Sequence, residues 1–268
     1  MDSTTKLAQE IRISSLQMVH KAGASHIGSA FSSVDLLAVL YGKILKYNSQ
    51  EPEWTQRDRF ILSKGHAASV IYATLAAMGY FPKEWLGTYS QSGSKLLGHV
   101  SHHVPGVELS TGSLGHGLPV GVGMALAGRQ EKSEYRVFVL LSDGELDEGS
   151  NWEAFLFAAH HQLENLIAIV DYNKIQSYGL VQDVLGLEPL NQKLTSFGWA
   201  VEEINGHNHL EILNVLKNLP LKRKIPTIII AHTIKGKGVS YMENQLAWHY
   251  KCPNEEQYNR ALEELENT

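Results

Sequence analysis

The sequence of 268 residues contains a single cysteine, Cys252, so no disulfide can form within the chain. No apolar run reaches the roughly 18 residues that a membrane-spanning helix needs. Charged residues interrupt the first 21 positions, which excludes the apolar core of a secretory signal peptide. Positive charge is not in excess either, because 23 Lys and Arg against 28 Asp and Glu give a net charge of −5. We therefore expect a soluble, cytoplasmic protein whose partners are neither nucleic acid nor membrane.

The composition is that of a globular protein with an unusual number of histidines. Hydrophobic residues make up 43% and charged residues 19% of the chain, enough to bury one sizeable core or two modest ones, which excludes a disordered or fibrous protein. No internal repeat, low-complexity segment or long linker interrupts it. The 13 histidines are the feature that calls for an explanation.

Five short, β-branched apolar runs predict parallel strands. None shows the clean polar alternation of a strand with one solvated face, and the segments between them are long enough for crossover helices. This pattern predicts an α/β fold, a doubly wound parallel sheet with helices on both faces. The runs are Arg59–Leu62, Val137–Leu141, Leu166–Val170, Ala200–Ile204 and Thr227–Ala231.

Helical spacing of apolar residues predicts the covering helices. The last of them begins at a capping pattern, in which Asn254 is followed three residues later by Gln257. The expected helices are Thr4–Lys21, Val34–Tyr47, Ala67–Met78, Gly149–Gln162 and Asn254–Glu266.

Polar and glycine residues gather directly after each predicted strand. In a parallel sheet these loops emerge along one edge, where open α/β sheets bind their ligands, so a single site built by all of them is the economical interpretation. The loops are Ser63–His66, Ser142–Glu145, Asp171–Asn173, Asn205–Asn208 and His232–Gly236.

Asp143 and Asn173 are the candidates for a metal site. Each follows a strand of one βαβ unit, and neighbouring strands lie about 5 Å apart, so a carboxylate and an amide oxygen could share a Mg²⁺ or Ca²⁺ ion. The Ile175 carbonyl is a third candidate ligand, and the Gly144 amide lies where a helix N-terminus would favour a phosphate. The alternative is structural, because Asp-Gly after a strand is often a turn and a loop Asn is often a cap.

Other ligand motifs are weak or absent. The chain has no GxxxxGK[ST] motif, and Gly115–Gly121 misses GxGxxG by one residue, which disfavours a dinucleotide site. His99, His102 and His103 could imitate a zinc cluster but lack a suitably spaced fourth ligand. Four further histidines, His20, His160, His161 and His209, are expected to be surface or core residues. His207 and His232 follow strands, but the sequence assigns them no role.

A resemblance to a known family adds to this interpretation. Ser142–Ala154, running on to Asp171–Ile175, resembles the thiamine diphosphate motif of transketolases. Further segments resemble transketolase in family order, so the resemblance covers nearly the whole chain: Lys21–Ser29, Leu62–Ala67, Leu97–His99, Ser110–Gly117, Thr233–Gly238 and Trp248–Lys251. It implies that residues 1–268 form a single domain, the diphosphate-binding N-terminal domain of the family.

The resemblance also implies a cofactor, thiamine diphosphate, and a metal ion. Mg²⁺, for which Ca²⁺ or Mn²⁺ could substitute, would be held by Asp143, Asn173 and the Ile175 carbonyl. The implied cofactor contacts are Ser29, His66, Gly112, Ser113, Leu114, Asp143, Gly144, Glu145, Asn173, Lys235 and His249.

The implied reaction is ketol transfer, in which a cofactor carbanion attacks a ketose and a two-carbon unit passes to an aldose. The implied catalytic residues are His26, His66, His99, His249 and Glu148. The histidines suit proton transfer to and from sugar hydroxyls near neutrality. A pentose phosphate is the default donor. Two departures from the family pattern, Ser142 for the usual Gly and His116 for a common Gln, leave nearby substrate contacts open.

The chain is less than half as long as transketolases and resembles only their first domain. The glutamate that activates the cofactor and the residues that bind substrate phosphate belong to the absent second domain. We therefore expect an N-terminal subunit that needs a separate C-terminal transketolase subunit, two copies of each, with Glu148 facing the partner. Another thiamine diphosphate-dependent carboligase or synthase, and a non-catalytic cofactor-binding paralogue, are the alternatives.

Overall fold

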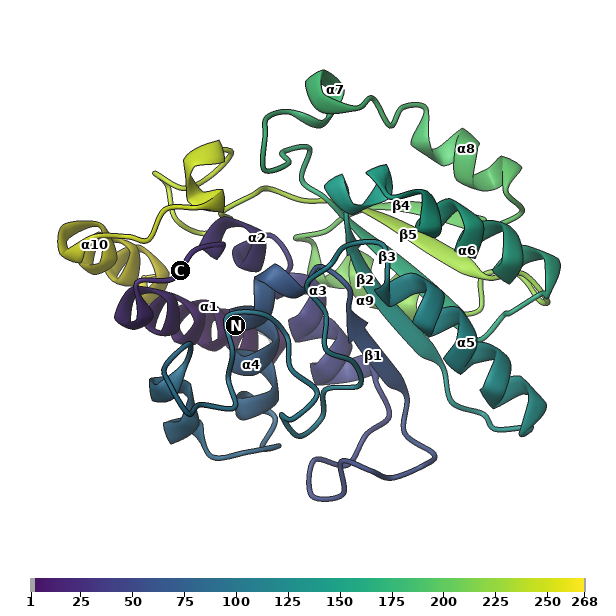
Figure 1. Ribbon diagram of the computed structural model, residues 1–268, viewed down its shortest axis with the longest axis horizontal. Coiled ribbons are helices and arrows are strands. Elements are labelled where there is room, and N and C mark those ends of the chain that lie inside the picture. The colour runs from purple at the N-terminus through teal and green to yellow at the C-terminus, as the bar shows by residue number, and fades with distance from the viewer. Residues whose placement is uncertain (1–2, 268) are drawn as a thin grey trace.

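Five parallel strands form one sheet at the centre of the molecule (Figure 1). The computed structural model describes residues 3–267. The strand order is β1-β2-β3-β5-β4, with every neighbouring pair parallel. The bounds are β1 Arg59–Leu62, β2 Val137–Ser142, β3 Leu166–Tyr172, β4 Ala200–Asn205 and β5 Thr227–His232. All five predicted strands are confirmed, and each begins at the predicted residue. β1 also ends where predicted, β2, β4 and β5 end one residue later, and β3 ends two residues later.

Helices cover both faces of the sheet, as the sequence predicts. Alternate strand residues point to opposite sides: Phe138 and Leu140 of β2 pack into one apolar cluster, and Val137 and Val139 into the other. Helices α1, α3, α4 and α9 contribute to the first cluster, and α5, α6 and α8 to the second. The doubly wound α/β fold class is confirmed.

The edge strand β4 departs from the expected burial. Strands β2 and β3 are buried along their whole length, but Glu202 and Glu203 of β4 are exposed. β4 pairs with β5 alone, so it lies at the border of the sheet and part of it faces solvent. The expectation that every strand is covered on both faces is wrong for β4.

Each of the five expected helices is found, the one from Val34 only in part, and α2, α5, α7, α8 and α9 are additional to the predicted ones. The segment expected as one helix to Tyr47 is α-helical only to Val39 and continues as a π-helix, Leu40–Ile44. The π-helix contains Gly42, a residue of low helix propensity. The helix bounds are α1 Ser3–Ala22, α2 Ile27–Phe31, α3 Val34–Val39, α4 Ala68–Ala77, α5 Gly117–Gln130, α6 Gly149–His160, α7 Val181–Val184, α8 Leu190–Ser196, α9 His209–Lys217 and α10 Glu255–Glu266. Short 3-10 helices span Gly65–Ala67, Lys83–Thr88, Gly144–Asp147 and Leu246–His249.

The strand register brings the post-strand loops to one edge. Ser142 of β2 lies beside Asp171 of β3, and Tyr172 lies beside His232 of β5. The loops that follow these strands therefore begin side by side. Within residues 3–267 no helix is long and apolar enough to cross a membrane.

The cap of α10 is a reciprocal one and generates a stability prediction. Asn254 Oδ1 accepts from the Gln257 amide (2.9 Å) and Gln257 Oε1 accepts from the Asn254 amide (3.1 Å). We expect Asn254→Ala to lower the free energy of unfolding by about 1 kcal/mol, because it removes a side-chain acceptor at the N-cap. Chemical denaturation checks this. Asn254→Asp is the control, since Asp also caps helices, and an equal loss in both variants would contradict the capping role.

Candidate active site

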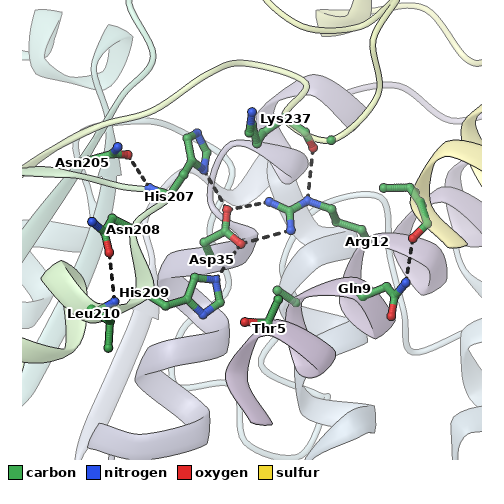
Figure 2. Close-up of a pocket in the computed structure, with 13 residues that line it drawn as sticks. Thr5, Gln9, Arg12, Asp35, Asn205, His207, Asn208, His209, Leu210 and Lys237 are labelled. Atoms are coloured by element: carbon green, nitrogen blue, oxygen red, sulfur yellow. Dashed lines mark hydrogen bonds and ion pairs between the residues drawn. The ribbon is translucent and has the colours of Figure 1, made fainter. Parts of the chain in front are cut away.

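Two cavities share the loop that follows β5. The smaller, about 240 Å³, contains Lys235, and the larger, about 700 Å³, contains Lys237 and Gly238. The larger cavity, around Asp35 (Figure 2), is lined by the loop after β4. That loop therefore does not share one site with the other loops, contrary to what the sequence led us to expect. None of the predicted site residues lines the larger cavity. The smaller cavity is lined by all but three of them: His26, Ser29, His66, His99, Gly112, Leu114, Asp143, Gly144, Asn173, Ile175, Lys235 and His249. We therefore take the smaller cavity as the candidate active site.

Three expected residues lie outside the cavity lining. Ser113 and Glu148 are exposed. Glu145 is fully buried, and its carboxylate accepts hydrogen bonds from Ser63 Oγ and from the Gly115 amide (3.0 Å). The side chain of Glu145 does not line the cavity, and it joins the loop after β2 to Ser63, after β1, and to Gly115, ahead of α5. Its expected contact with a cofactor stays a prediction.

Asp143 and Asn173 lie at the ends of the adjacent strands β2 and β3. Asp143 Oδ1 accepts from the Gly144 amide (2.7 Å) and Oδ2 from the Lys174 amide (2.5 Å). Asn173 Oδ1 accepts from the Ile175 amide (3.1 Å). Among the described residues no three His, Cys, Asp or Glu side chains are grouped to hold a metal. A cation at this edge would therefore depend on one carboxylate together with amide and carbonyl oxygens, which are hard ligands.

Lys235 is a buried cation in the same cavity. Its Nζ donates to the Ile175 carbonyl (2.9 Å) and lies 3.0 Å from His249 Nδ1. Burial lowers the pKa of Lys235 to about 8, while the nearby carboxylate of Asp143 acts in the opposite direction. The Ile175 carbonyl thus already contacts a positive charge.

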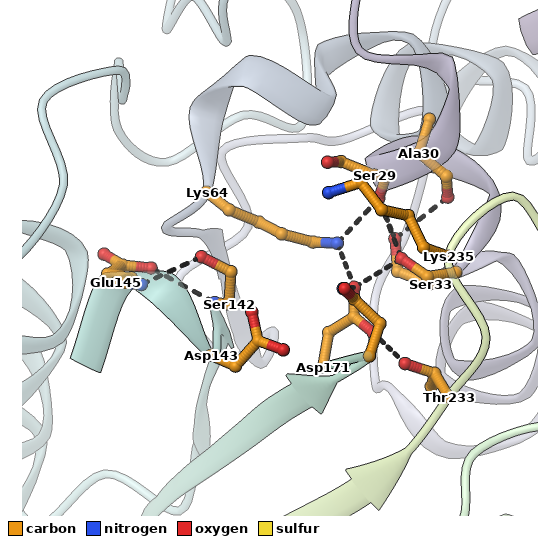
Figure 3. Close-up of polar contacts among 12 residues, drawn as sticks. Ser29, Ala30, Ser33, Lys64, Ser142, Asp143, Glu145, Asp171, Thr233 and Lys235 are labelled. Carbon is orange, nitrogen blue, oxygen red and sulfur yellow. Dashed lines mark hydrogen bonds and ion pairs between the residues drawn. The ribbon is translucent and has the colours of Figure 1, made fainter. Parts of the chain in front are cut away.

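A second buried lysine, Lys64, lines the same cavity and connects several of the elements around it (Figure 3). Lys64 forms an ion pair with Asp171 and donates to the Ser29 carbonyl (2.7 Å). Asp171 also accepts from Ser32 Oγ (2.5 Å) and from Thr233 Oγ1. Burial alone would raise the pKa of Asp171, but Lys64 and these donors hold it below its usual value.

Lys64 is not among the residues predicted from the sequence to form the site. The signal was its place between Ser63 and His66 in a loop already assigned to the site. A lysine in a loop is most often exposed, so its burial could not be anticipated.

Four histidines form one cluster in the cavity. The ring of His26 lies 5.2 Å from that of His66, 5.9 Å from that of His99 and 5.1 Å from that of His249, centroid to centroid. The backbone of His26 is left-handed (φ 73°), and its amide donates to the His249 carbonyl (2.9 Å). This uncommon conformation aims the ring into the cluster ahead of α2.

Burial keeps several of these rings neutral. It lowers the pKa of His26 to about 4, with His99 and Lys235 adding to the effect. It lowers the pKa of His249 to about 3, with Lys235 the next cause, and holds that of His66 well below its usual range. Neutral imidazoles both donate and accept hydrogen bonds, so the cluster can bind hydroxyl groups near pH 7.

Comparison with known proteins points to one family. A family model described as the thiamine diphosphate-binding domain of transketolase matches residues 3–265. The chain is 43% identical over 250 residues to an apulose-4-phosphate transketolase subunit of Phocaeicola vulgatus, covering 93% of this chain and 89% of the relative. It is 41% identical over 260 residues to the 6-deoxy-6-sulfo-D-fructose transketolase subunit SqwG of Clostridium sp., covering 97% and 94%.

Solved structures are similar over the whole chain but extend well beyond it. Transketolase from Leishmania mexicana superposes with a TM-score of 0.94 at 31% identity, covering 99% of this chain and 42% of that protein. Transketolase from Campylobacter jejuni gives 0.93 at 32% identity, covering 99% and 43%. The chain thus spans less than half the length of these structures and about nine-tenths of the relatives that are named as subunits.

The low pKa of His26 predicts a loss of stability in acid. The pKa of His26 is 6.5 in the unfolded chain and about 4 in the folded chain. Between pH 6.5 and pH 4 the unfolded chain therefore binds a proton that the folded chain does not. Stability is therefore lost as the pH falls from 6.5 towards 4. We expect His26→Gln to lessen the fall in Tm between pH 7 and about pH 5, as measured by thermal unfolding of the full chain.

The matched control is His160→Gln, because His160 lies on α6, away from the histidine cluster. It should leave the acid-induced fall in Tm as it is in the unaltered chain. If both substitutions change that fall equally, the burial of His26 is not its cause.

Proposed function

The chain belongs to the transketolase family, and from this premise we propose that it is the thiamine diphosphate-binding subunit of a two-chain transketolase. In this proposal residues 1–268 act as one N-terminal domain, and a separate C-terminal subunit completes the enzyme, with two copies of each chain. The relatives of similar length are themselves named as subunits, which supports a partner. The observation that carries the proposal is the meeting of residues from all over the chain in one cavity beside Asp143, Lys64 and Lys235.

The residues present fit a diphosphate with a divalent cation. Lys64 and Lys235 bring two buried positive charges to the cavity, and Asp143 brings one carboxylate. The Gly144 amide donates to Asp143 Oδ1, and a Cβ on Gly144 would lie 3.0 Å from the Gln176 side chain, so glycine is the residue that fits here without displacing Gln176. We propose that Asp143, Asn173 and the Ile175 carbonyl hold Mg²⁺, whose remaining positions phosphate oxygens and water would fill.

Each remaining residue has a role in this proposal. Ser29, Gly144 and Lys235 bind the diphosphate, and Gly112 and Leu114 border the aminopyrimidine ring. When bound, the cofactor would supply the carbanion chemistry that cleaves and forms the carbon–carbon bond. His26, His66, His99 and His249, the clustered imidazoles, bind and orient sugar hydroxyls by hydrogen bonds, for which burial keeps three of them neutral.

The acid that activates the cofactor is proposed to come from the partner. Among the described residues that line the cavity, Asp143 is the only Asp or Glu, and it is assigned to the metal. Glu148, at the start of α6, is exposed and free to face a second chain. The site would then be completed at the interface between subunits.

We propose a ketose with an anionic terminal group as the donor. The relatives are called transketolases of apulose-4-phosphate and of 6-deoxy-6-sulfo-D-fructose, which carry a phosphate and a sulfonate. In this chain the buried Lys64 is paired with Asp171, and the buried Lys235 is the residue proposed to bind the diphosphate. Recognition of the terminal group therefore falls to the partner.

The proposal predicts activity only in a mixture of the two chains. We expect ketol transfer from a ketose phosphate to an aldose phosphate, with thiamine diphosphate and Mg²⁺, when the chain is combined with its C-terminal transketolase subunit. The chain alone should be inactive, because its described residues offer no second carboxylate to the cavity. Turnover is measured by chromatography of the sugar products, with sulfonated ketoses as a parallel donor series. Turnover by the lone chain would refute the need for a partner.

The metal assignment predicts that Asp143→Asn weakens cofactor binding. Losing the only carboxylate ligand should weaken affinity for thiamine diphosphate in Mg²⁺ by at least the roughly 10–100-fold seen when supporting groups of a metal are lost. Calorimetric titration of the two-chain complex checks this. Asp147→Asn removes a charge from the same loop outside the cavity lining, and should bind normally. Equal affinity in both variants would place the metal elsewhere.

A further inference from the structure

The loop that carries Lys235 is attached to the loop that follows β4. The Gly206 amide donates to the His232 carbonyl (2.9 Å), and the Ile234 amide donates to His207 Nε2 (2.8 Å). A Cβ on Gly206 would lie only 2.5 Å from Thr233 Cγ2, so the two loops are as close as glycine allows. The position of Lys235 therefore depends on a segment that lines the other cavity.

His207 is held in one tautomer by its two partners. Because Nε2 accepts the Ile234 N–H, it carries no hydrogen, and the hydrogen of the neutral ring lies on Nδ1. Nδ1 then donates to Asp35 Oδ2 (2.7 Å). Asp35, on α3, is only 5% exposed. Its carboxylate thus determines which nitrogen of His207 faces the Lys235 loop.

Arg12 contacts the same loop on the other side of Lys235. Its guanidinium forms two bonds to Asp35 (3.0 and 2.6 Å), and its Nε donates to the Lys237 carbonyl (3.1 Å). Figure 2 shows Arg12 and His207 reaching Asp35 from opposite sides. The loop is therefore held at Ile234 and at Lys237 by two side chains that share one anchor.

We propose that Asp35 is a positioning residue for Lys235, acting through His207 and Arg12. The part of this proposal that concerns cofactor affinity rests on the proposed function, in which Lys235 binds the diphosphate. Burial would raise the pKa of the Asp35 carboxyl, but Arg12, His207 and His209 hold it well below its usual range, so the anchor stays ionised near pH 7.

His209 provides a matched control in the same network. Its Nε2 lies 3.0 Å from Asp35 Oδ1, but its Nδ1 lies 2.8 Å from Thr4 Oγ1 on α1, so both ring nitrogens are directed away from the Lys235 loop. Replacing His209 removes a partner of Asp35 without removing a bond to Ile234 or Lys237. It therefore separates general loss of the network from loss of the contact to the loop.

The first experiment is hydrogen exchange at the Ile234 amide in the full chain, which needs no cofactor. His207→Asn retains a donor for Asp35, but its side chain is too short to place an acceptor near the position of Nε2, whereas His207→Gln can place its oxygen there. We expect exchange at Ile234 to be at least tenfold faster in the Asn variant. It should stay within about threefold of the unaltered chain for His207→Gln and His209→Asn. Thermal unfolding verifies that each variant is folded.

The second experiment measures cofactor dependence in the two-chain complex. His207→Asn and Asp35→Asn should raise the KM for thiamine diphosphate about tenfold or more and change kcat at saturating cofactor by less than about threefold. His207→Gln should restore most of the affinity. If Asp35 and His207 only stabilised the fold, the substitutions would lower Tm without raising the KM selectively over kcat.

Two results would overturn the positioning role. One is unchanged exchange at Ile234 in a folded His207→Asn variant, and the other is an equal rise in KM for His207→Asn and His209→Asn. Failure of the unaltered complex to bind thiamine diphosphate would instead overturn the proposed function. In that case, faster exchange at the Ile234 amide in His207→Asn, but not in the other variants, still supports the role of His207 in positioning the Lys235 loop.

Discussion

The buried ion pair of Lys64 and Asp171 is the interaction on which the candidate site depends. Both side chains are fully excluded from solvent. Removing such charges from water costs several kcal/mol each, so the pair persists only because further hydrogen bonds satisfy it. Those bonds come from Ser29 and Ser32, in and at the end of α2, and from Thr233 in the loop after β5. The need to compensate two charges thereby joins the ends of β1, β3 and β5 to α2.

A second buried carboxylate, Asp35, performs a similar task on the far side of the Lys235 loop. Asp171 contacts this loop through Thr233, while Asp35 is linked to it through Arg12 and His207. Burial opposes the charge of Lys235 and lowers its pKa, while the carboxylate of Asp143 acts in the opposite direction. Among the described residues Asp143 is the one carboxylate that lines the cavity, and it is proposed to serve the metal, which is consistent with a site shared between two chains.

Local patterns were enough to predict much of this protein. All five strands, the cap of α10 and the meeting of Asp143 with Asn173 follow from apolar runs and from polar residues placed just after strands. These signals are local because a buried strand must be apolar along its length, and because parallel strands carry their following loops to one edge. The ordered transketolase-like segments extended this to the lining of the cavity.

The remaining features depend on contacts between residues far apart in the chain. Lys64 meets Asp171 across 107 positions and Asp35 meets His207 across 172, so no nearby pattern reports either pair. Glu145 also belongs here, because only packing shows that its carboxylate is used by Ser63 and Gly115. The sequence by itself determined which elements form and which loops share an edge, since strand burial and direction are local properties. Tertiary structure decided which charges are buried and what each one holds, since compensating a buried charge requires partners from distant segments.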